Sequence, residues 1–145
     1  MRIMALDVGD KTVGVAVSDA LGITAQGLTT VERVGIKKDT SVIMNLIKEH
    51  DCSTVILGLP INLDGSDSIQ TEKVREFYDK LSNKLRSQGM AHVKLDFYDE
   101  RFSTKMAEHV LIEGDVRREK RKSIIDKQAA VIILQGYLES NKNKN

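Results

Sequence analysis

Carboxylate side chains stand beside apolar runs in three separate stretches of this sequence. They are Asp7 after residues 3–6, Asp99 and Glu100 after residues 93–98, and Asp126 before residues 129–134. An unpaired carboxylate is costly to bury, so it should meet a cation, a cluster of donors or a metal. Three converging carboxylates would form an all-oxygen site, which suits hard cations such as Mg²⁺ or Mn²⁺.

Each carboxylate also has a simpler structural explanation. Asp7 could accept hydrogen bonds from the tight turn that follows it. Asp126 stands three residues after Ser123, which is the spacing of a capping box at a helix start. Glu100 could pair with the arginine that follows it, and its neighbour Asp99 is an alternative ligand. A shared site is favoured because the three simple explanations would have to coincide in one fold.

The elements that must position these carboxylates follow from apolar periodicity and turn residues. The predicted strands are 2–8, 12–18, 27–32, 54–59 and 93–98. The predicted helices run from Asp39 or Thr40 to about His50, from about 67 to 88 with a stop at Gly89, from 103 to about 113, and from about 123 to 139. The first three strands have short connections, which favour antiparallel pairing, and the later strands alternate with helices.

This order predicts an α/β protein with the ribonuclease H-like fold, a five-stranded mixed sheet with helices on both faces. The first strand would be central, so Asp7 would stand at the carboxyl end of a buried strand. Asp126 precedes Ala129, Ala130 and Ile133 by three, four and seven residues, so it should project from the helix face that packs on the sheet.

An all-oxygen site of this kind could support metal-assisted hydrolysis. Two Mg²⁺ ions about 4 Å apart could be held by Asp7, Asp126 and either Asp99 or Glu100, one ion activating water and the other stabilising the leaving oxygen. No protein nucleophile is needed for such an in-line displacement.

Four motifs in order resemble one family. The stretches "LDVGDKTVGVAVSD", "GLPINLDG", "DERFST" and "DKQAAVIILQGYL" are similar to those of the YqgF (RuvX) family, whose members are described as pre-16S rRNA nucleases or Holliday junction resolvases. The resemblance implies a ribonuclease H-like metal-dependent nuclease with acidic residues at Asp7, Glu100 and Asp126, leaving 5′-phosphate and 3′-hydroxyl ends. Many relatives have a Lys-Arg pair where this chain has Lys11 and Thr12, so one phosphate contact is expected to be missing or supplied elsewhere.

Basic residues near the carboxylates are candidate contacts for a polyanion backbone. The stretch "RREKRK" carries five cations in six positions directly before the helix predicted to bear Asp126, although a charge run is usually a solvated loop. The candidate substrate-binding residues are Lys11, Arg101, Arg117, Arg118, Arg121 and Lys122. Residues 58–65 are expected to form a loop at the edge of the substrate. No histidine is assigned a catalytic role.

Length and composition set the remaining bounds. The 145 residues predict a single nuclease domain over 1–140, with a flexible basic tail over 141–145. A net charge of +1 indicates no broad basic surface, so any such surface must be local. The sequence contains neither a membrane span nor a signal peptide, which predicts a cytoplasmic protein. Cys52 is the only cysteine, which excludes an internal disulfide and a thiolate metal cluster.

Four functions are consistent with these residues. The first is a nuclease that matures the 5′ end of pre-16S rRNA, with ribosomal particles as a further partner. The second is a resolvase that cuts branched DNA at a Holliday junction. The third is a non-catalytic RNA-binding ribosome-assembly factor, which a metal-dependent cleavage assay would separate from the first two. The hairpin "DVGDKTVGVAVSD" also resembles the phosphate-binding hairpin of actin-like and sugar kinases, but those proteins need two such domains.

Overall fold

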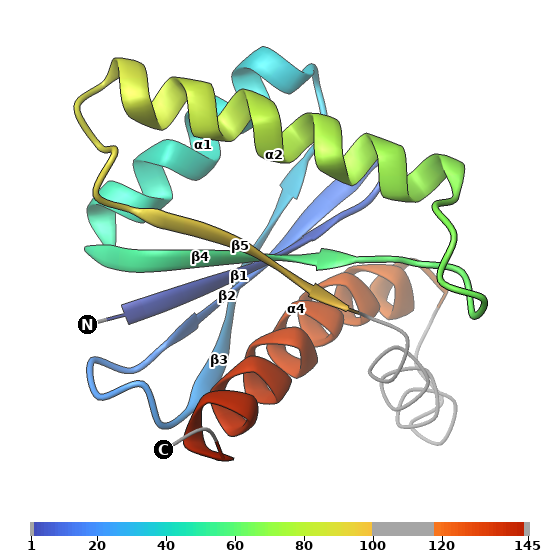
Figure 1. The fold of residues 1–145 in the computed structure, drawn as a ribbon. Helices are drawn as coiled ribbons and strands as arrows, with labels where there is room; N and C mark the ends of the chain where they lie inside the picture. Colours follow the sequence, from blue (N-terminus) through green and yellow to red (C-terminus); the bar gives the residue numbers. More distant parts are fainter. Residues whose placement is uncertain (1, 100–117, 144–145) are drawn as a thin grey trace.

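A five-stranded mixed sheet lies at the centre of the structure. The computed structural model describes residues 2–99 and the helix 118–143, within which side chains are described for 128–140. The strands are β1 (Arg2–Val8), β2 (Thr12–Ser18), β3 (Ala25–Glu32), β4 (Cys52–Leu59) and β5 (Lys94–Asp99). Their order across the sheet is β3-β2-β1-β4-β5, so β1 is central (Figure 1). β1 pairs antiparallel with β2 and parallel with β4, which confirms the predicted mixed sheet.

Helices cover both faces of this sheet. α1 (Ile36–Glu49) and α2 (Ile69–Ser87) lie together on one face, and α4 (Arg118–Asn143) crosses the other (Figure 1). The larger apolar core lies between the sheet and the α1/α2 pair, and the smaller core joins the sheet to α4. The strands alternate between these two cores because successive side chains of a strand point to opposite faces.

The predicted strands agree closely with the observed ones. β1 and β2 have the expected bounds, whereas β3 and β4 each begin two residues earlier and β5 is shifted by one. β4 begins at Cys52, whose thiol is buried. Burial raises the pKa of this thiol to about 11.

The start of α1 differs from the predicted start at Asp39 or Thr40. The helix begins at Ile36, with Gly35 as an N-cap that has no side chain to offer. Asp39 lies in the first turn, and its carboxylate accepts hydrogen bonds from the preceding amides of Val34 at 3.0 Å and Gly35 at 3.3 Å. Asp39 therefore does not cap the amides of the first helical turn. Its carboxylate accepts from amides that precede the helix.

The start of α4 also corrects the sequence analysis. The predicted start at Ser123 is wrong, because the helix begins at Arg118 and includes most of the basic run. Arginine, lysine and glutamate are good helix formers, so the charged stretch continues the helix instead of forming a loop before it. Ser123 and Asp126 therefore cannot form a capping box at the helix start.

The other helices give a mixed comparison. α2 starts at the N-cap Ser68, whose side chain accepts from the amide of Thr71, and the expected stop at Gly89 is confirmed by its φ of 73°. The helix predicted over 103–113 lies outside the described residues. α4 continues to Asn143, and the division into a domain over 1–140 and a tail stays a prediction. Among the described residues, none of the helices is both long and apolar enough to cross a membrane.

Candidate active site

Asp7 lies on the face of the sheet that α4 covers. In β1, Met4 and Leu6 belong to the core under α1 and α2, whereas Ala5 belongs to the core under α4. Asp7 lies two residues after Ala5 and therefore on the same face of the sheet. It is half-buried near the carboxyl end of the strand. The central position of β1 and the carboxylate at its end are as the sequence predicted.

Glycine occupies the position beside Asp7 on both neighbouring strands. Asp7 pairs with Gly14 of β2. On the other side, Leu6 pairs with Leu57 of β4, so the next step of the same register brings Gly58 beside Asp7. Residues that pair across strands share a face, so neither neighbouring strand contributes a side chain beside this carboxylate. Bulkier residues at these two positions would occupy the space next to Asp7.

α4 brings the position of Asp126 to this same face. Ala130, Ile133 and Leu134 are buried in the core shared with Ala5. Position 126 precedes Ala130 by four residues and Ile133 by seven, so it lies on the same face of the helix. Figure 1 shows α4 beginning on the side of the molecule toward which β4 and β5 point, and β1 runs parallel to β4.

The full ligand set cannot be assembled within the described residues. Glu100 and the side chain of Asp126 lie outside them, and the described part of the chain contains no group of three or more His, Cys, Asp or Glu residues that could hold a metal. Asp99 was the alternative to Glu100. It pairs with Leu59, a residue of the core under α1 and α2, so its strand position belongs to the face opposite Asp7.

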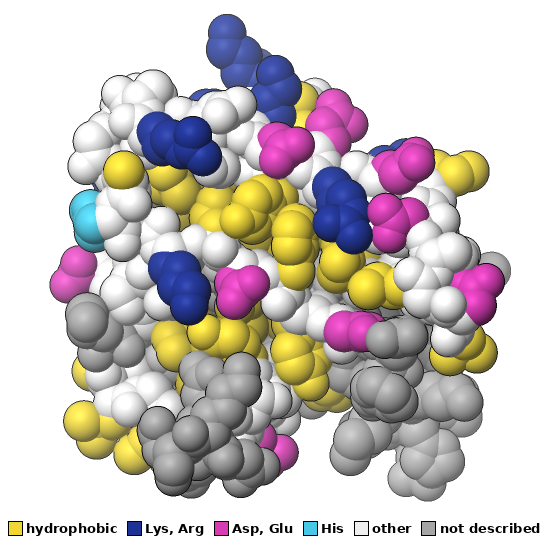
Figure 2. Space-filling model, in the orientation of Figure 1, with side chains coloured by type: hydrophobic (Ala, Val, Ile, Leu, Met, Phe, Trp, Pro, Cys, Tyr) yellow, Lys and Arg dark blue, Asp and Glu magenta, His cyan; other side chains and the backbone are white. Residues whose placement is uncertain are grey.

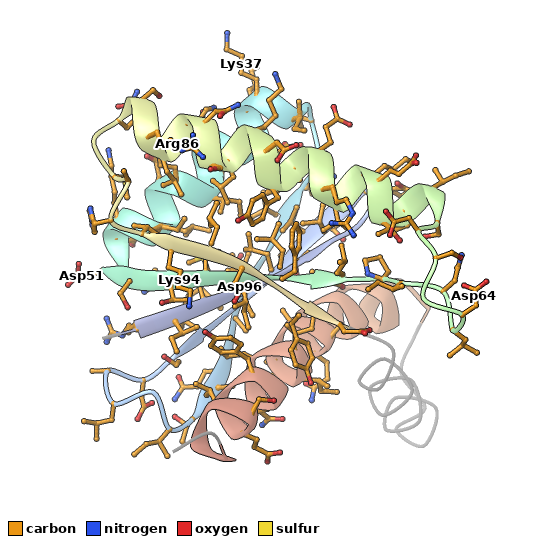
Figure 3. The ribbon with its side chains drawn as sticks, in the orientation of Figure 1. Lys37, Asp51, Asp64, Arg86, Lys94 and Asp96 are labelled. Atoms are coloured by element: carbon orange, nitrogen blue, oxygen red, sulfur yellow. The ribbon has the colours of Figure 1, made fainter. Side chains whose placement is uncertain are left out.

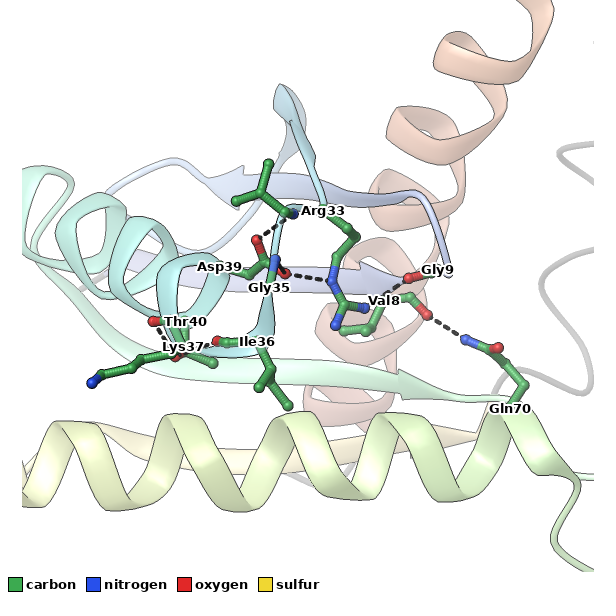
Figure 4. Close-up of polar contacts among 10 residues, drawn as sticks. Val8, Gly9, Arg33, Gly35, Ile36, Lys37, Asp39, Thr40 and Gln70 are labelled. Atoms are coloured by element: carbon green, nitrogen blue, oxygen red, sulfur yellow. Dashed lines mark hydrogen bonds and ion pairs between the residues drawn. The ribbon is translucent and has the colours of Figure 1, made fainter.

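The turn that follows Asp7 is held from the α1/α2 side. Its own bond runs from the amide of Gly9 to the carbonyl of Thr12 at 2.8 Å. Arg33 donates from Nη1 to the carbonyl of Gly9 at 2.8 Å, and Gln70 donates from Nε2 to the carbonyl of Val8 at 2.8 Å (Figure 4). Lys11, the predicted phosphate contact, is exposed in this turn.

A buried ion pair orients Arg33. Its Nε donates to the carboxylate of Asp39 at 2.7 Å, and the Asp39 side chain is only 1% exposed. Burial by itself raises the pKa of the Asp39 carboxyl. Hydrogen bonds from the amide of Val34, the guanidinium of Arg33 and the amide of Gly35 together outweigh burial, so the pKa lies below the usual 3.8.

Comparison with known proteins identifies the family. A family model described as "RuvX: Holliday junction resolvase" matches residues 1–140. The chain belongs to the RuvX family. A relative from Clostridioides difficile (strain 630), named "Putative pre-16S rRNA nuclease", is 49% identical over 142 residues, covering 98% of this chain and 96% of the relative. A relative of the same name from Thermoanaerobacter pseudethanolicus (strain ATCC 33223 / 39E) is 48% identical over 145 residues, covering 99% and 100%.

Solved structures confirm the ribonuclease H-like fold of this RuvX chain. RuvC of T. thermophilus in complex with a Holliday junction substrate matches with a TM-score of 0.62 and 14% identity, over 99% of this chain and 96% of RuvC. The fowlpox virus Holliday junction resolvase matches with a TM-score of 0.56 and 16% identity, over 97% of this chain and 99% of the resolvase. At such low identity these matches show the fold.

The basic residues predicted for this RuvX chain are only partly described. Arg101 and Arg117 lie outside the described residues, whereas Arg118, Arg121 and Lys122 occupy the first turns of α4. Their spacing of three and four residues puts these positions on one side of the helix. On the face shown in Figure 2, the described Lys and Arg side chains are interleaved with Asp and Glu.

The loop between β4 and α2 includes residues 60–65 of the stretch that the sequence analysis expected to form a loop, whereas residues 58 and 59 belong to β4. The Asp64 carboxylate accepts from the Ser66 hydroxyl at 2.6 Å and from the Ser66 amide at 2.9 Å, and these bonds lower the pKa of Asp64. Gly65 has a φ of 88°, which glycine adopts readily. Figure 3 shows Asp64 at the end of this loop, on the side toward which β4 points. The loop is therefore ordered by its own polar groups.

The sequence analysis missed Arg33 and Gln70 and assigned Asp39 a different role. Gly9 precedes Arg33 by 24 positions and Val8 precedes Gln70 by 62, so no local spacing links them. The available signal was Asp39 beside an apolar helix face, six residues after an arginine. A buried carboxylate needs a cation or donors, and Arg33 was a candidate for that partner.

Proposed function

We propose that this chain is a divalent-metal-dependent nuclease that hydrolyses phosphodiester bonds in the precursor of 16S rRNA. The structural observation that carries the proposal is Asp7, a half-buried carboxylate on the central strand with glycine beside it on both neighbouring strands. α4 contributes position 126 to the same face, one turn before the buried Ala130. Family membership supports the reaction class, and the names of the relatives support the substrate.

Asp7 is chemically suited to a metal centre of hard oxygen ligands. Carboxylate oxygens are the preferred ligands of Mg²⁺ and Mn²⁺, and the glycines beside Asp7 add no side chain of their own on that face. In this proposal Asp7, Glu100 and Asp126 hold the metal. When bound, the metal would supply Lewis-acid stabilisation of the charge that develops on the phosphate during displacement.

The remaining roles fall to cations of the chain. Lys11 is exposed two residues after Gly9 and would neutralise a substrate phosphate near Asp7. Arg101, Arg117, Arg118, Arg121 and Lys122 would extend this contact along the substrate. The substrate is pre-rRNA, free or within a ribosomal particle, and the reaction takes place in the cytoplasm.

A cleavage assay on two substrates tests the proposal. Purified protein is incubated side by side with a structured RNA that spans the 5′ end of mature 16S rRNA and with a four-way DNA junction. We expect cleavage of the RNA with Mg²⁺ or Mn²⁺, leaving 5′-phosphate ends, and no turnover with Ca²⁺ or with a chelator. Preferential cutting of the junction would favour the resolvase function that the family description names.

Two aspartates on the same sheet face provide a matched pair of variants. Asp7→Asn should lower cleavage by a hundredfold or more, roughly the loss that follows removal of one charge-stabilising group. Asp96 lies on the same sheet face as Asp7 but on the edge strand β5, where it pairs with Ile56. Because Asp96 is not one of the proposed metal ligands, the Asp96→Asn variant should cleave RNA normally. Binding of RNA without cleavage in every metal would favour an assembly factor and contradict the nuclease.

A further inference from the structure

Three carbonyls around the turn after Asp7 accept hydrogen bonds from Arg33 and Gln70. The Val8 carbonyl accepts from Gln70, and the Gly9 carbonyl accepts from the Arg33 guanidinium. The Lys11 carbonyl accepts from the backbone amide of Arg33 at 2.8 Å. The Arg33 side chain therefore holds the turn at Gly9 (Figure 4), and the Arg33 backbone amide holds it at Lys11.

The β1–β2 ladder does not extend over this turn. The last pair of the β1–β2 ladder is Val8 with Val13, so residues 9–11 lie beyond it. Among the described hydrogen bonds, the Gly9 carbonyl accepts from the Arg33 guanidinium, and the Lys11 carbonyl accepts from the Arg33 amide, directly after the β2–β3 pair of Thr12 with Glu32. An exposed ion pair between Asp10 and Lys73, at 2.9 Å, adds little because solvent screens it.

Arg33 is rigidly oriented. Its Nε is fixed by the buried Asp39, and its guanidinium lies over the ring of Phe77, 5.3 Å from the ring centre. The planar guanidinium donates from Nε to one acceptor and from Nη1 to another in a fixed geometry. A lysine at this position would keep the charge but could not make both bonds in the same way.

We propose that Arg33, oriented by Asp39, is a positioning residue of the nuclease site. It acts from the opposite side of the sheet by fixing residues 9–11, so that the Lys11 ammonium is kept where it meets the substrate phosphate beside Asp7. This inference rests on the proposed function. Arg33 touches neither substrate nor metal in this account, and its effect on cleavage passes through Lys11.

The chain offers a matched control for Arg33. Arg75 also pairs with an aspartate, Asp67, at 3.2 Å, and also lies over an aromatic ring, Phe97, at 5.5 Å. Arg75 has no hydrogen bond to the turn 9–11 among those described. Comparing Arg33→Lys with Arg75→Lys therefore controls for shortening an arginine that pairs with an aspartate over an aromatic ring, although only the Arg33 pair is buried, and the cycle with Lys11 separates the turn contact from the loss of that pair.

The experiment measures cleavage of the RNA in a double-mutant cycle with Lys11→Ala. Arg33→Lys should lower turnover by roughly tenfold or more, because small displacements of a contacting group carry large rate costs. In the Lys11→Ala background the same substitution should change turnover little, because its effect passes through Lys11. Hydrogen exchange of the Gly9 amide, measured without substrate, should rise in Arg33→Lys and stay unchanged in Arg75→Lys.

Several outcomes would overturn the inference. The inference is overturned if Arg33→Lys cleaves the RNA as fast as Arg75→Lys. It is also overturned if Arg33→Lys lowers turnover equally with and without Lys11, because that would indicate a general structural effect. If Arg33→Lys fails to fold, Arg33→Leu combined with Asp39→Asn removes the turn contact without leaving an unpaired buried charge, and normal cleavage by that double variant would contradict the inference. A parent protein that cuts neither substrate would instead overturn the proposed function.

Discussion

Asp126 is the residue whose interpretation changes most with the structure. The sequence left open whether it caps a helix or binds a metal. Because α4 begins at Arg118, position 126 lies in the interior of the helix, on the face that carries the buried Ala130 and Ile133. The capping explanation is therefore excluded. The metal-binding explanation of a carboxylate on the helix face that packs on the sheet stays open.

Substitution of Asp126 tests the metal-binding explanation. A ligand clustered with Asp7 and Glu100 suffers like-charge repulsion without metal, and Asp126→Asn relieves it. We expect a metal-free variant at least as stable as the parent, less stabilised by Mg²⁺, and slower in cleavage by about a hundredfold or more. Thermal melting with and without Mg²⁺ and a cleavage assay measure these effects. Ser123→Ala is the control, and a variant that melts lower yet cuts normally would remove Asp126 from the site.

At the scale of elements, α4 approaches β5 closely at Gly136. A Cβ at Gly136 of α4 would overlap the phenol ring of Tyr98 of β5. Glycine in a helix interior is otherwise unfavourable by about 1 kcal/mol relative to alanine. Its presence here is explained by the ring that lies against the helix backbone.

Whether Gly136→Ala raises or lowers the free energy of unfolding should therefore depend on Tyr98. In the parent, the overlap should destabilise the fold by about 1–3 kcal/mol, as overpacking does. In a Tyr98→Ala background the overlap is gone, and the same substitution should stabilise by about 1 kcal/mol through helix propensity. Urea unfolding of the four chains measures both signs. Equal effects in the two backgrounds would mean that the ring simply moves aside.

The basic run of α4 provides a second prediction at this scale. Neutral replacement of Arg117, Arg118, Arg121 and Lys122 should weaken RNA binding and flatten its salt dependence, by a slope of about 0.7 for each lost phosphate contact on a single strand. Saturated turnover should change little. The matched control neutralises Lys37, Lys38, Lys48 and Lys80, which belong to α1 and α2. An equal change in slope for both variants would indicate a general charge effect.

At the scale of the whole molecule, acid should weaken the link between Arg33 and Asp39. The folded-state pKa of Asp39 lies below its usual 3.8. Ionised Asp39 therefore contributes its full stability above about pH 4, and this contribution is lost as pH falls through the lower folded-state pKa. Asparagine does not titrate, so the difference between the parent and Asp39→Asn should be constant at neutral pH and shrink only in strong acid.

Thermal melting from pH 7 to pH 2 checks this. At neutral pH Asp39→Asn should cost about 2 kcal/mol, the scale of a buried hydrogen bond to a charged group. Asp64→Asn is the control, because Asp64 also has a lowered pKa but lies in an exposed loop, where solvent screens its interactions. A difference that stays constant down to pH 2 would contradict the lowered pKa of Asp39.

The sequence predicted those parts of the fold that depend on local patterns. The bounds of β1 and β2 were predicted correctly, because the turn residues Gly9–Lys11 separate two apolar runs. The starts of α1 and α4 were missed because Gly35 has no capping side chain and because a charged run can continue a helix. Asp7 was found from its place after an apolar run.

The surroundings of Asp7 could not be predicted in the same way. The glycines beside it come from strands separated from it in sequence, and their alignment depends on sheet register. Arg33 contacts the turn only because the end of β3 and the start of α1 converge there. Such contacts arise from the tertiary fold and have no local spacing in the sequence.

The aromatic ring packed against Gly136 also makes the protein a suitable subject for fluorescence. The chain has three tyrosines and no tryptophan, so its intrinsic emission comes from tyrosine alone. Tyr98 and Tyr137 join the apolar core under α4, whereas Tyr78 stacks on Phe97 on the opposite side, with ring centres 4.4 Å apart. Two of the three emitters therefore report on the contact between α4 and the sheet. Replacing Tyr78 with phenylalanine would leave a protein whose emission follows that contact without any attached dye.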